Sequence, residues 1–403
     1  MTNFAKRRDK LRSQLRKQKV DALLVTNFTN VSYLTGFSGA DSYLLLTSKH
    51  AIVLSDERYT TQLEEECPDL EFEIRGPGKK MLSSVSQVIA SHRLKLLAFE
   101  SNSVTIALHS AMQSALAKSL PNCELVATGG WIEALRMVKD RVEIERTRVA
   151  CNLARRAFEV VRATLTPEMT ELQVAADLEY QARRFGGKCM SFPSIVAVGD
   201  RSALPHANPT SQRLGADDFV LIDWGVNEGL YMSDLTRILV TGKISPKLRK
   251  IYEIVLKAQL AAIKAIKPGV TCESVDLVAR TIIAKAGFGK QFGHGLGHGT
   301  GLEIHEAPRL AQRLAQRLAQ RSAQRSAQRS AMGPAKGRKS AGGQTASSGP
   351  GAFLKAGMIV TVEPGIYLPG WGGVRIEDDI LVTRSGHEVL TSVPKQLDDC
   401  MVG

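Results

Sequence analysis

The chain has 403 residues, of which 43% are hydrophobic, and it carries 53 Lys and Arg against 40 Asp and Glu. This length and apolar content suffice for two domains with large cores, which excludes a mainly disordered protein. The formal net charge of +13 is concentrated in two stretches, because residues 1–19 contribute +7 and residues 309–340 contribute +9. The remainder carries −3, so the overall charge does not indicate a polyanion partner for the whole protein.

The cysteines are scattered and form no CxxC motif, which predicts reduced thiols. They are Cys67, Cys123, Cys151, Cys189, Cys272 and Cys400. The N-terminus is charged from the start, and no window approaches the roughly 18 to 20 apolar residues that span a bilayer. Leu11 and Leu15 have helical spacing, which predicts a basic helix that packs them inward; a membrane-surface contact is the less favoured alternative. We therefore expect a soluble, cytoplasmic protein without a membrane partner.

The first third of the chain alternates short apolar runs with helical segments. Buried strands are expected at residues 22–25, 43–46, 51–54 and 96–99. Residues 27–30 have turn composition, and a helix is expected near residues 104–120. Strands that alternate with helices predict an α/β layered domain.

A long, charged and periodic segment at about 132–180 predicts helices that open a second domain. We therefore expect domains at 1–135 and 136–403. Beyond residue 189 the sequence predicts strand pairs, with helices at about 246–267 and 272–286.

Residues 309–350 predict a low-complexity insertion, since RLAQ and RSAQ repeats pass into a mixture of Gly, Ser, Lys and Pro. A period of four drifts about 40° per repeat on a 3.6-residue helix, so the arginines form no single stripe. A solvated expansion is the favoured interpretation. The alternative is contact with nucleic acid or another polyanion through the stretch from Arg309 to Lys339, by charge alone.

A first hairpin is expected around residues 227–229, where Asn-Glu-Gly separates two apolar runs. Asp223 and Asp234 are symmetric about this turn, which predicts that they face one another on one side of the hairpin. Facing carboxylates in an apolar context indicate a cation between them. Two exposed acids at strand ends are an equally supported alternative for this pair alone.

A second hairpin repeats the arrangement, because Glu363 and Glu377 are symmetric about Gly370. Four acids on two hairpins are poorly explained as surface residues. Together with an imidazole, they suit a pair of divalent ions.

Histidines 294, 298 and 305 lie in a glycine-rich stretch, whose glycines allow the backbone to approach a site closely. The spacing of His294 and His298 resembles that of a zinc-protease helix, but Gly295, Gly297 and Gly299 disfavour a helix. A phosphate-binding loop is also disfavoured, because no Lys-Ser/Thr pair follows. His206 is expected in a loop, and by itself its position does not indicate a functional role.

These residues together resemble the creatinase/prolidase-like metallopeptidase family, in its Xaa-Pro peptidase branch. The resemblance implies an α/β N-terminal creatinase-like domain, with matches at residues 30–39 and 56–59, followed by an α+β catalytic domain of the "pita-bread" fold. The metal ligands that it implies are Asp223, Asp234, His298, Glu363 and Glu377. Creatinase itself lacks these ligands, and methionine aminopeptidases generally lack the N-terminal domain, so both are poorer matches.

By this resemblance, Asp223 binds one ion, His298 and Glu363 bind the other, and Asp234 and Glu377 bridge them. Two divalent ions are implied, with Mn²⁺ first and Co²⁺, Zn²⁺ or Fe²⁺ as alternatives. The resemblance assigns the catalytic and substrate-binding roles to Glu363 as proton acceptor, to His305 and His206 at the substrate carbonyl, and to His294 at the proline side. Arg375 is a candidate for ligand binding or proton movement, and a structural ion pair is its equally supported alternative.

The expected activity is hydrolysis of the X-Pro bond, which releases the N-terminal residue from peptides with proline second. The alternatives are a prolidase restricted to X-Pro dipeptides and a non-catalytic binding protein on the same fold. The expected partners are proline-containing peptides and, because relatives are often dimers, a second copy of the chain.

Overall fold

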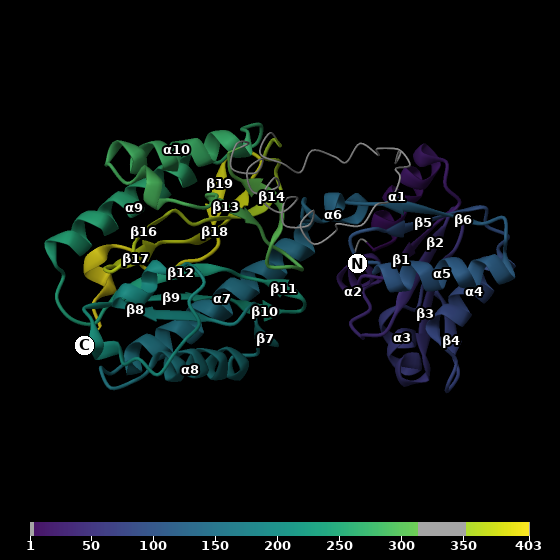
Figure 1. The fold of residues 1–403 in the computed structure, drawn as a ribbon, viewed down its shortest axis with the longest axis horizontal. Helices are drawn as coiled ribbons and strands as arrows, with labels where there is room; N and C mark the ends of the chain where they lie inside the picture. Colours follow the sequence, from purple (N-terminus) through teal and green to yellow (C-terminus); the bar gives the residue numbers. More distant parts are fainter. Residues whose placement is uncertain (1–3, 313–351, 403) are drawn as a thin grey trace, which may run out of the picture. The chain divides into compact units, whose positions relative to one another are not determined.

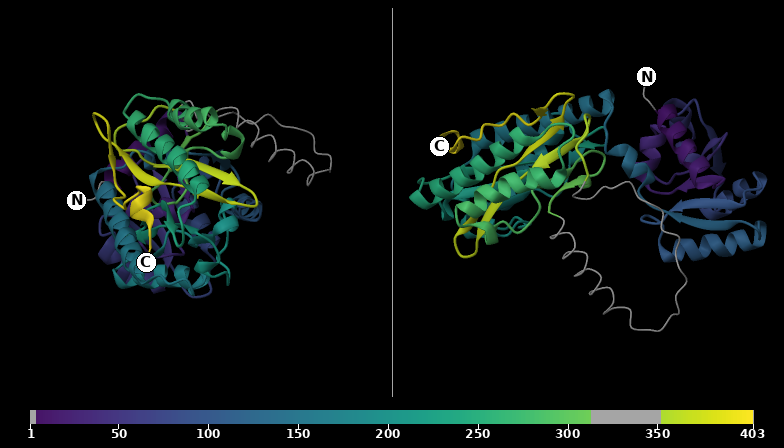
Figure 2. Two further views of the ribbon diagram at one scale, coloured as in Figure 1. Left: turned by 90° about the vertical axis from the view of Figure 1, so that its left-hand side faces the viewer. Right: turned by 90° about the horizontal axis from the view of Figure 1, so that it is seen from above.

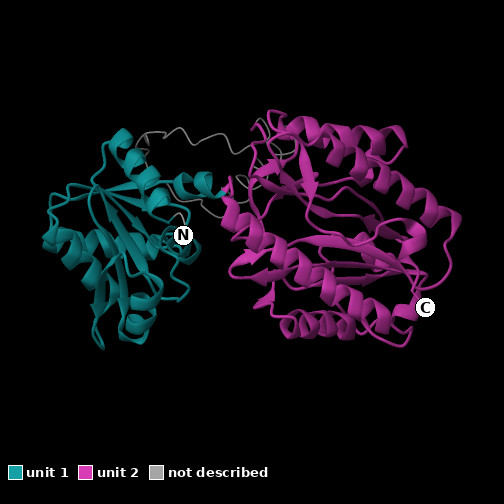
Figure 3. Ribbon diagram, turned by 180° about the vertical axis from the view of Figure 1, so that it is seen from behind, with its two compact units in different colours: residues 1–136, 340–346 teal, residues 137–339, 347–403 magenta. Residues whose placement is uncertain are grey.

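The computed structural model describes residues 4–312 and 352–402. They form two compact units that divide between Arg136 and Met137 (Figure 3). Each unit has its own cluster of buried apolar side chains. Each unit therefore has the separate core that defines a domain.

The first unit is a layered α/β structure. Its helices are α1 (Phe4–Gln18), α2 (Phe28–Thr35), α3 (Thr60–Glu66), α4 (Met81–Ser91), α5 (Ile106–Ser119) and α6 (Trp131–Arg136), and its strands are β1 (Ala22–Val25), β2 (Tyr43–Thr47), β3 (Ala51–Asp56), β4 (Glu71–Arg75), β5 (Leu96–Glu100) and β6 (Glu124–Thr128). The four predicted strands and the helix near 104–120 are confirmed. The edge strands β4 and β6 were not predicted, because they are only partly buried and lack a continuous apolar run.

One six-stranded sheet runs in the order β4-β3-β2-β1-β5-β6. Strand β2 is antiparallel to both β1 and β3. Strand β4 is parallel to β3, β5 is parallel to β1, and β6 is parallel to β5. Strand β1 is buried along its whole length because α4 and α5 cover one face of the sheet and α1 and α2 cover the other (Figure 2). This two-sided burial explains the unbroken apolar run at 22–25.

The turn predicted at residues 27–30 is wrong, because α2 begins there. The Asn27 side chain accepts a hydrogen bond from the Asn30 backbone N–H and caps the helix. The polar residues that indicate a turn are also the preferred residues at a helix N-terminus.

Helix α1 packs Leu11 and Leu15 inward, as its spacing predicts. Two of its basic residues are also buried, which corrects the expected exposed basic face. Arg7 donates to the Tyr33 carbonyl, and Arg8 donates to the Leu34 carbonyl and to Asp69. Part of the N-terminal positive charge therefore serves the packing of the first unit.

The second unit holds four helices and several small sheets. Its helices are α7 (Arg141–Thr164), α8 (Glu171–Arg184), α9 (Pro246–Ala265) and α10 (Cys272–Lys285), and its strands are β7 (Cys189–Met190), β8 (Ile195–Val198), β9 (Phe219–Trp224), β10 (Val226–Glu228), β11 (Tyr231–Met232), β12 (Leu235–Val240), β13 (Gly297–Gly299), β14 (Glu306–Leu310), β15 (Ile359–Val362), β16 (Gly365–Leu368), β17 (Gly372–Arg375), β18 (Asp378–Val382) and β19 (His387–Val389). Short 3-10 turns are η1 (Glu57–Tyr59) in the first unit and η2 (Gly199–Ala203), η3 (Leu214–Ala216), η4 (Gly289–Gln291) and η5 (Leu397–Cys400) in the second.

The strands of the second unit lie between two helical layers. The sheets have the orders β12-β9-β8, β11-β10-β7, β14-β13-β15-β18-β19 and β16-β17. Helices α7 and α8 lie on one side of the strands, and α9 and α10 lie on the other (Figure 1). Ser245 and Thr271 cap α9 and α10, so the two predicted helices are confirmed.

A buried tryptophan fixes α7 against β9. The Trp224 ring stacks on Phe158 with 4.2 Å between the ring centroids, and its Nε1 donates to the Ala154 carbonyl. Since Asp223 directly precedes Trp224 on β9, the packing of α7 also fixes the position of this carboxylate.

The predicted start of the insertion at residue 309 is wrong, because Arg309 and Leu310 belong to β14. Strand β14 pairs with β13, and Leu310 is fully buried, so the first two residues of the first repeat are part of the folded sheet. The remaining repeats, and with them the proposed polyanion contact, lie outside the described residues. Among the residues that the structure describes, no helix is long and apolar enough to cross a membrane.

Candidate active site

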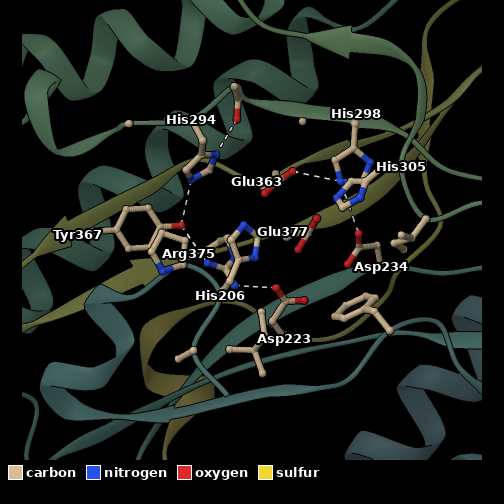
Figure 4. Close-up of a pocket in the computed structure, with 18 of the residues that line it drawn as sticks. His206, Asp223, Asp234, His294, His298, His305, Glu363, Tyr367, Arg375 and Glu377 are labelled. Atoms are coloured by element: carbon tan, nitrogen blue, oxygen red, sulfur yellow. Dashed lines mark hydrogen bonds and ion pairs between the residues drawn. The ribbon is translucent and has the colours of Figure 1, made fainter. Parts of the chain in front are cut away.

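A cavity of about 770 Å³ in the second unit brings together all nine residues predicted for the site (Figure 4). They are His206, Asp223, Asp234, His294, His298, His305, Glu363, Arg375 and Glu377. These side chains come from segments up to 171 positions apart in the sequence, so the fold gathers them into one place.

The β9 to β12 hairpin supplies Asp223 and Asp234, but in a different register from the predicted one. Asp223 lies opposite Thr236, so the predicted direct pairing with Asp234 is wrong by two residues. The cause is the turn, which is made by Gly229 and Leu230 with positive φ of 52° and 74° rather than by residues 227–229. A shift of two residues keeps the side chain on the same face, which is why both carboxylates still line the cavity.

The second hairpin has the predicted register. Gly365 pairs with Arg375 and Leu368 pairs with Gly372, which places the centre at Gly370. Glu363 and Glu377 lie two residues beyond the ends of these paired strands and continue the same symmetry.

His298 lies on β13 and not on a helix, as its glycine neighbours predict. Its Nδ1 lies 3.0 Å from the Gly299 carbonyl, which can only accept, so Nδ1 carries the proton and Nε2 has a free lone pair. Nε2 lies 3.4 Å from Glu363 Oε1 and 3.7 Å from Asp234 Oδ2. The imidazole therefore presents its ligating nitrogen to the carboxylates.

The carboxylates are buried close together, which disfavours their charged forms. Burial, followed by repulsion from neighbouring carboxylates, raises the pKa of Asp234 and Glu377 well above their usual range. Burial raises the pKa of Glu363 to about 8 and lowers the pKa of His298 to about 3. His298 is thus neutral at physiological pH, as a metal ligand must be.

These residues fit divalent metal ions. Ligand atoms of Asp234, His298 and Glu377 all lie within 4.8 Å of one another. Asp223 Oδ1 is buried, and it has no hydrogen-bond partner among the described residues. A buried polar atom without a partner is costly, so this oxygen, beside other buried carboxylates and a neutral imidazole, has the chemistry of a binding site for hard cations.

A hydrogen-bonded chain joins Asp223 to His294 through a residue that the sequence analysis missed. Arg375 donates through Nη2 to Asp223 Oδ2 at 2.6 Å and through Nη1 to the Tyr367 hydroxyl at 2.9 Å. The Tyr367 hydroxyl donates to His294 Nε2 at 3.0 Å, because Nδ1 of that ring holds its proton toward the Gly295 carbonyl. Tyr367 is four residues from Glu363, so the alternation of side chains in a strand could have identified it.

Three further residues of the cavity lining are His305, His206 and Arg309. The rings of His305 and His298 are edge-to-face with centroids 4.4 Å apart, and His206 reaches the cavity from the turn after η2. Arg309, opposite His298 in the β13 to β14 ladder, also lines the cavity. Its position within the first RLAQ repeat concealed it from the sequence analysis.

Comparisons with known proteins give a family for each of the two units. The metallopeptidase family M24 model matches residues 145–384, and the creatinase/prolidase N-terminal domain model matches residues 7–138. The structure is similar to an Xaa-Pro dipeptidase from Bacillus anthracis (35% identity, TM-score 0.85, 98% of this chain and 99% of that one). It is also similar to an X-Pro aminopeptidase from Thermotoga maritima (31% identity, TM-score 0.79, 95% and 99%).

An uncharacterized peptidase from Bacillus subtilis is 34% identical over 389 residues, which cover 96% of this chain and 98% of that protein. The family models together span both units, and the fold expected from the resemblance is confirmed. The chain therefore belongs to metallopeptidase family M24, with a creatinase/prolidase N-terminal domain ahead of the catalytic domain.

Proposed function

We propose that the protein uses two divalent ions to hydrolyse the X-Pro peptide bond and release the N-terminal residue. The observation that carries this proposal is the convergence of Asp234, His298 and Glu377 beside the unpartnered oxygen of Asp223 in one cavity. The similar structures from B. anthracis and T. maritima, described as an Xaa-Pro dipeptidase and an X-Pro aminopeptidase, support the choice of bond.

The five predicted ligands divide as the family resemblance implies. Asp223 would hold one ion, His298 and Glu363 would hold the other, and Asp234 and Glu377 would contribute to both. Bound divalent ions lower the pKa of a water molecule and polarise the scissile carbonyl. Mn²⁺ is the first candidate, because oxygen ligands with one imidazole suit it.

The side chains of the cavity supply the remaining steps. Cations beside Glu363 would favour its charged form, and that carboxylate would accept a proton from the attacking water. Burial lowers the pKa of His305, so its imidazole is neutral at pH 7 and can donate its N–H to the substrate carbonyl, with His206 beside it. Arg375 is held between Asp223 and Tyr367, and it keeps the Asp223 carboxylate oriented.

The proline ring needs an apolar site, because the X-Pro bond is a tertiary amide that carries a ring at its nitrogen. Phe192, Pro193 and Ile195 give the cavity an apolar wall. His294, whose ring is packed edge-on against Phe292, lies at this site in our proposal.

A peptide panel tests the reaction. The protein is stripped of metal with a chelator and assayed with Mn²⁺, Co²⁺, Zn²⁺ or Fe²⁺ on Ala-Pro, Ala-Pro-Gly and Ala-Ala-Gly. We expect cleavage of the proline peptides only, and only with metal. We expect Glu363→Gln, which keeps the shape of the side chain, to lose about 10²–10⁴-fold in kcat because it removes the proton acceptor. Wild-type protein that binds metal and cleaves neither proline peptide would overturn the proposal.

A prolidase restricted to dipeptides is the second candidate, and Arg309 favours it. Arg309 lines the cavity and is an exposed residue. There it can pair with a carboxylate close to the scissile bond, as in a dipeptide but not in a longer peptide.

Chain length decides between the two candidates. A prolidase cleaves Ala-Pro but not Ala-Pro-Gly, and Arg309→Gln raises its KM for Ala-Pro, whereas Arg309→Lys retains the charge and much of the binding. An aminopeptidase cleaves both peptides, and Arg309→Gln changes its KM for the tripeptide little.

A further inference from the structure

The Thr236 hydroxyl lies between two groups of the metal site. Thr236 is on β12, fully buried, and directly opposite Asp223. Its Oγ1 donates to Glu377 Oε2 at 2.6 Å and accepts from Arg375 Nε at 3.1 Å. Because the guanidinium can only donate, the hydroxyl accepts from Arg375 and directs its own proton to the Glu377 oxygen.

These bonds connect ligands that come from different hairpins. Arg375 donates to Asp223 at 2.6 Å, so a continuous chain runs from Asp223 through Arg375 and Thr236 to Glu377. Asp223 belongs to the β12-β9-β8 sheet, and Glu377 follows the β16-β17 hairpin. The Thr236 carbonyl also accepts from the Glu377 backbone N–H at 3.2 Å, which joins the same two segments through the main chain.

We propose that Thr236 is a positioning residue of the metal site, which orients the Glu377 carboxylate and, through Arg375, sets its spacing from Asp223. This inference rests on the metal site of the proposed function. Thr236 is not among the residues that line the cavity, and its hydroxyl is already hydrogen-bonded to Glu377 and Arg375. Loss of its hydroxyl leaves Arg375 Nε as a buried donor without this acceptor and frees one Glu377 oxygen to rotate. Such residues behind the ligands tune metal affinity in other metalloproteins.

A purely structural hydroxyl would stabilise the fold without affecting the metal, so metal affinity separates the two roles. The test compares Thr236→Val, which keeps the shape but removes the hydroxyl, with Thr236→Ser, which keeps the hydroxyl. Thr147→Val is the matched control, because Thr147 is also fully buried but its hydroxyl donates to the Glu143 carbonyl within α7.

Each protein is stripped of metal and titrated with Mn²⁺ by calorimetry, without substrate, and its thermal unfolding is measured in chelator. We expect Thr236→Val to bind Mn²⁺ about 10–100-fold more weakly than wild type. Thr236→Ser restores most of the affinity, and Thr147→Val binds as wild type does. Should Thr236→Val fail to fold, Thr236→Ala replaces it with the same expectation.

Any one of three results would overturn the inference. The first is that Thr236→Val, or Thr236→Ala in its place, binds Mn²⁺ as tightly as wild type. The second and third are that Thr147→Val or Thr236→Ser loses as much Mn²⁺ affinity as Thr236→Val. Wild type that binds no divalent ion overturns both this inference and the proposed function. Wild type that binds Mn²⁺ but cleaves no X-Pro peptide overturns the proposed reaction alone.

Discussion

At the scale of single residues, burial determines the protonation state of the imidazoles in the cavity. His294 has a pKa lowered to about 4, chiefly by burial. Its Nδ1 proton is directed to the Gly295 carbonyl, and Nε2 accepts from Tyr367. A second proton would have to displace the tyrosine hydrogen bond, so the neutral ring is the form that the fold accommodates.

This preference makes stability depend on pH. The folded pKa of His294, about 4, lies below its ordinary value of 6.5, so acid favours the unfolded chain. The stabilisation from the neutral ring is complete above pH 6.5 and is lost as the pH falls toward 4. We expect the free energy of unfolding of wild type to fall more steeply over this window than that of His294→Gln, measured by urea denaturation of metal-free protein. Parallel curves would contradict a neutral, buried His294.

The four acids and the histidines of the glycine-rich stretch leave visible patterns in the sequence, most clearly the turn symmetry of Glu363 and Glu377. The inclusion of His206 and the roles of the site residues came from the family resemblance. Thr236 was missed because its role depends on a hydrogen bond to Arg375, 139 positions away. Tyr367 lies near Glu363 in sequence, and only the alternation of side chains in the strand pointed to it. Arg309 was missed because a repeat pattern conceals a single strand residue. The Asp223 register was missed because Leu230 adopts a positive φ that is rare for a leucine.

At the scale of elements, glycines of the glycine-rich stretch allow neighbouring strands to pack closely. A Cβ built on Gly297 would lie 2.1 Å from the Thr361 carbonyl oxygen, and one on Gly299 would lie 2.3 Å from the Ala307 carbonyl oxygen. Gly293 differs, because a Cβ there meets nothing within 4 Å. The glycines next to His298 therefore allow β13 to approach β14 and β15, whereas Gly293 has no such role.

Two alanine substitutions test this difference. We expect Gly297→Ala to destabilise the protein by about 1–3 kcal/mol and to weaken metal binding, because β13 must move away from Thr361. Gly293→Ala, in the same stretch and without a clash or a positive φ, should leave the thermal midpoint unchanged. Equal effects of the two substitutions in thermal unfolding would show that close approach is not the function of Gly297.

Helix and strand positions were predictable where burial leaves a periodic pattern, as in β1, α9 and α10. Helix α2 was not, because Asn27 caps it with a residue type that also forms turns, and Asn30 acts through tertiary contacts. Asn30 is fully buried, its amide donates to Glu100, and it accepts from Arg136, which lies 106 positions away. Local turn propensity cannot reveal a partner at that distance.

At the scale of the whole molecule, the metal site belongs to one unit. Every residue that lines the cavity lies between Phe192 and Glu377, within the second unit. The first unit has its own core on a six-stranded sheet. Ligand binding stabilises only the cooperative unit that forms the site.

Calorimetry can resolve this arrangement. We expect two unfolding transitions, of which Mn²⁺ raises only that of the second unit. The gain is about 2.7 kcal/mol at a hundredfold excess of free metal over Kd. Glu377→Gln provides the control, since it removes a ligand without altering the first unit. A shift of both transitions, or of neither, would contradict a metal site confined to the second unit.

Arg309 and Leu310 belong both to the repeat tract and to β14. This overlap limits how much of the tract can be removed without shortening the strand. A shortened protein that lacks Arg309 and Leu310 would lose two of the five residues of β14, whereas one joined beyond Gln312 keeps the β13 to β14 ladder. Since the ladder ends before the second repeat, four-residue units can be gained or lost downstream without shifting its register. The paired residues of β14, Arg309 among them, thus lie ahead of the part of the tract in which such units would change in number.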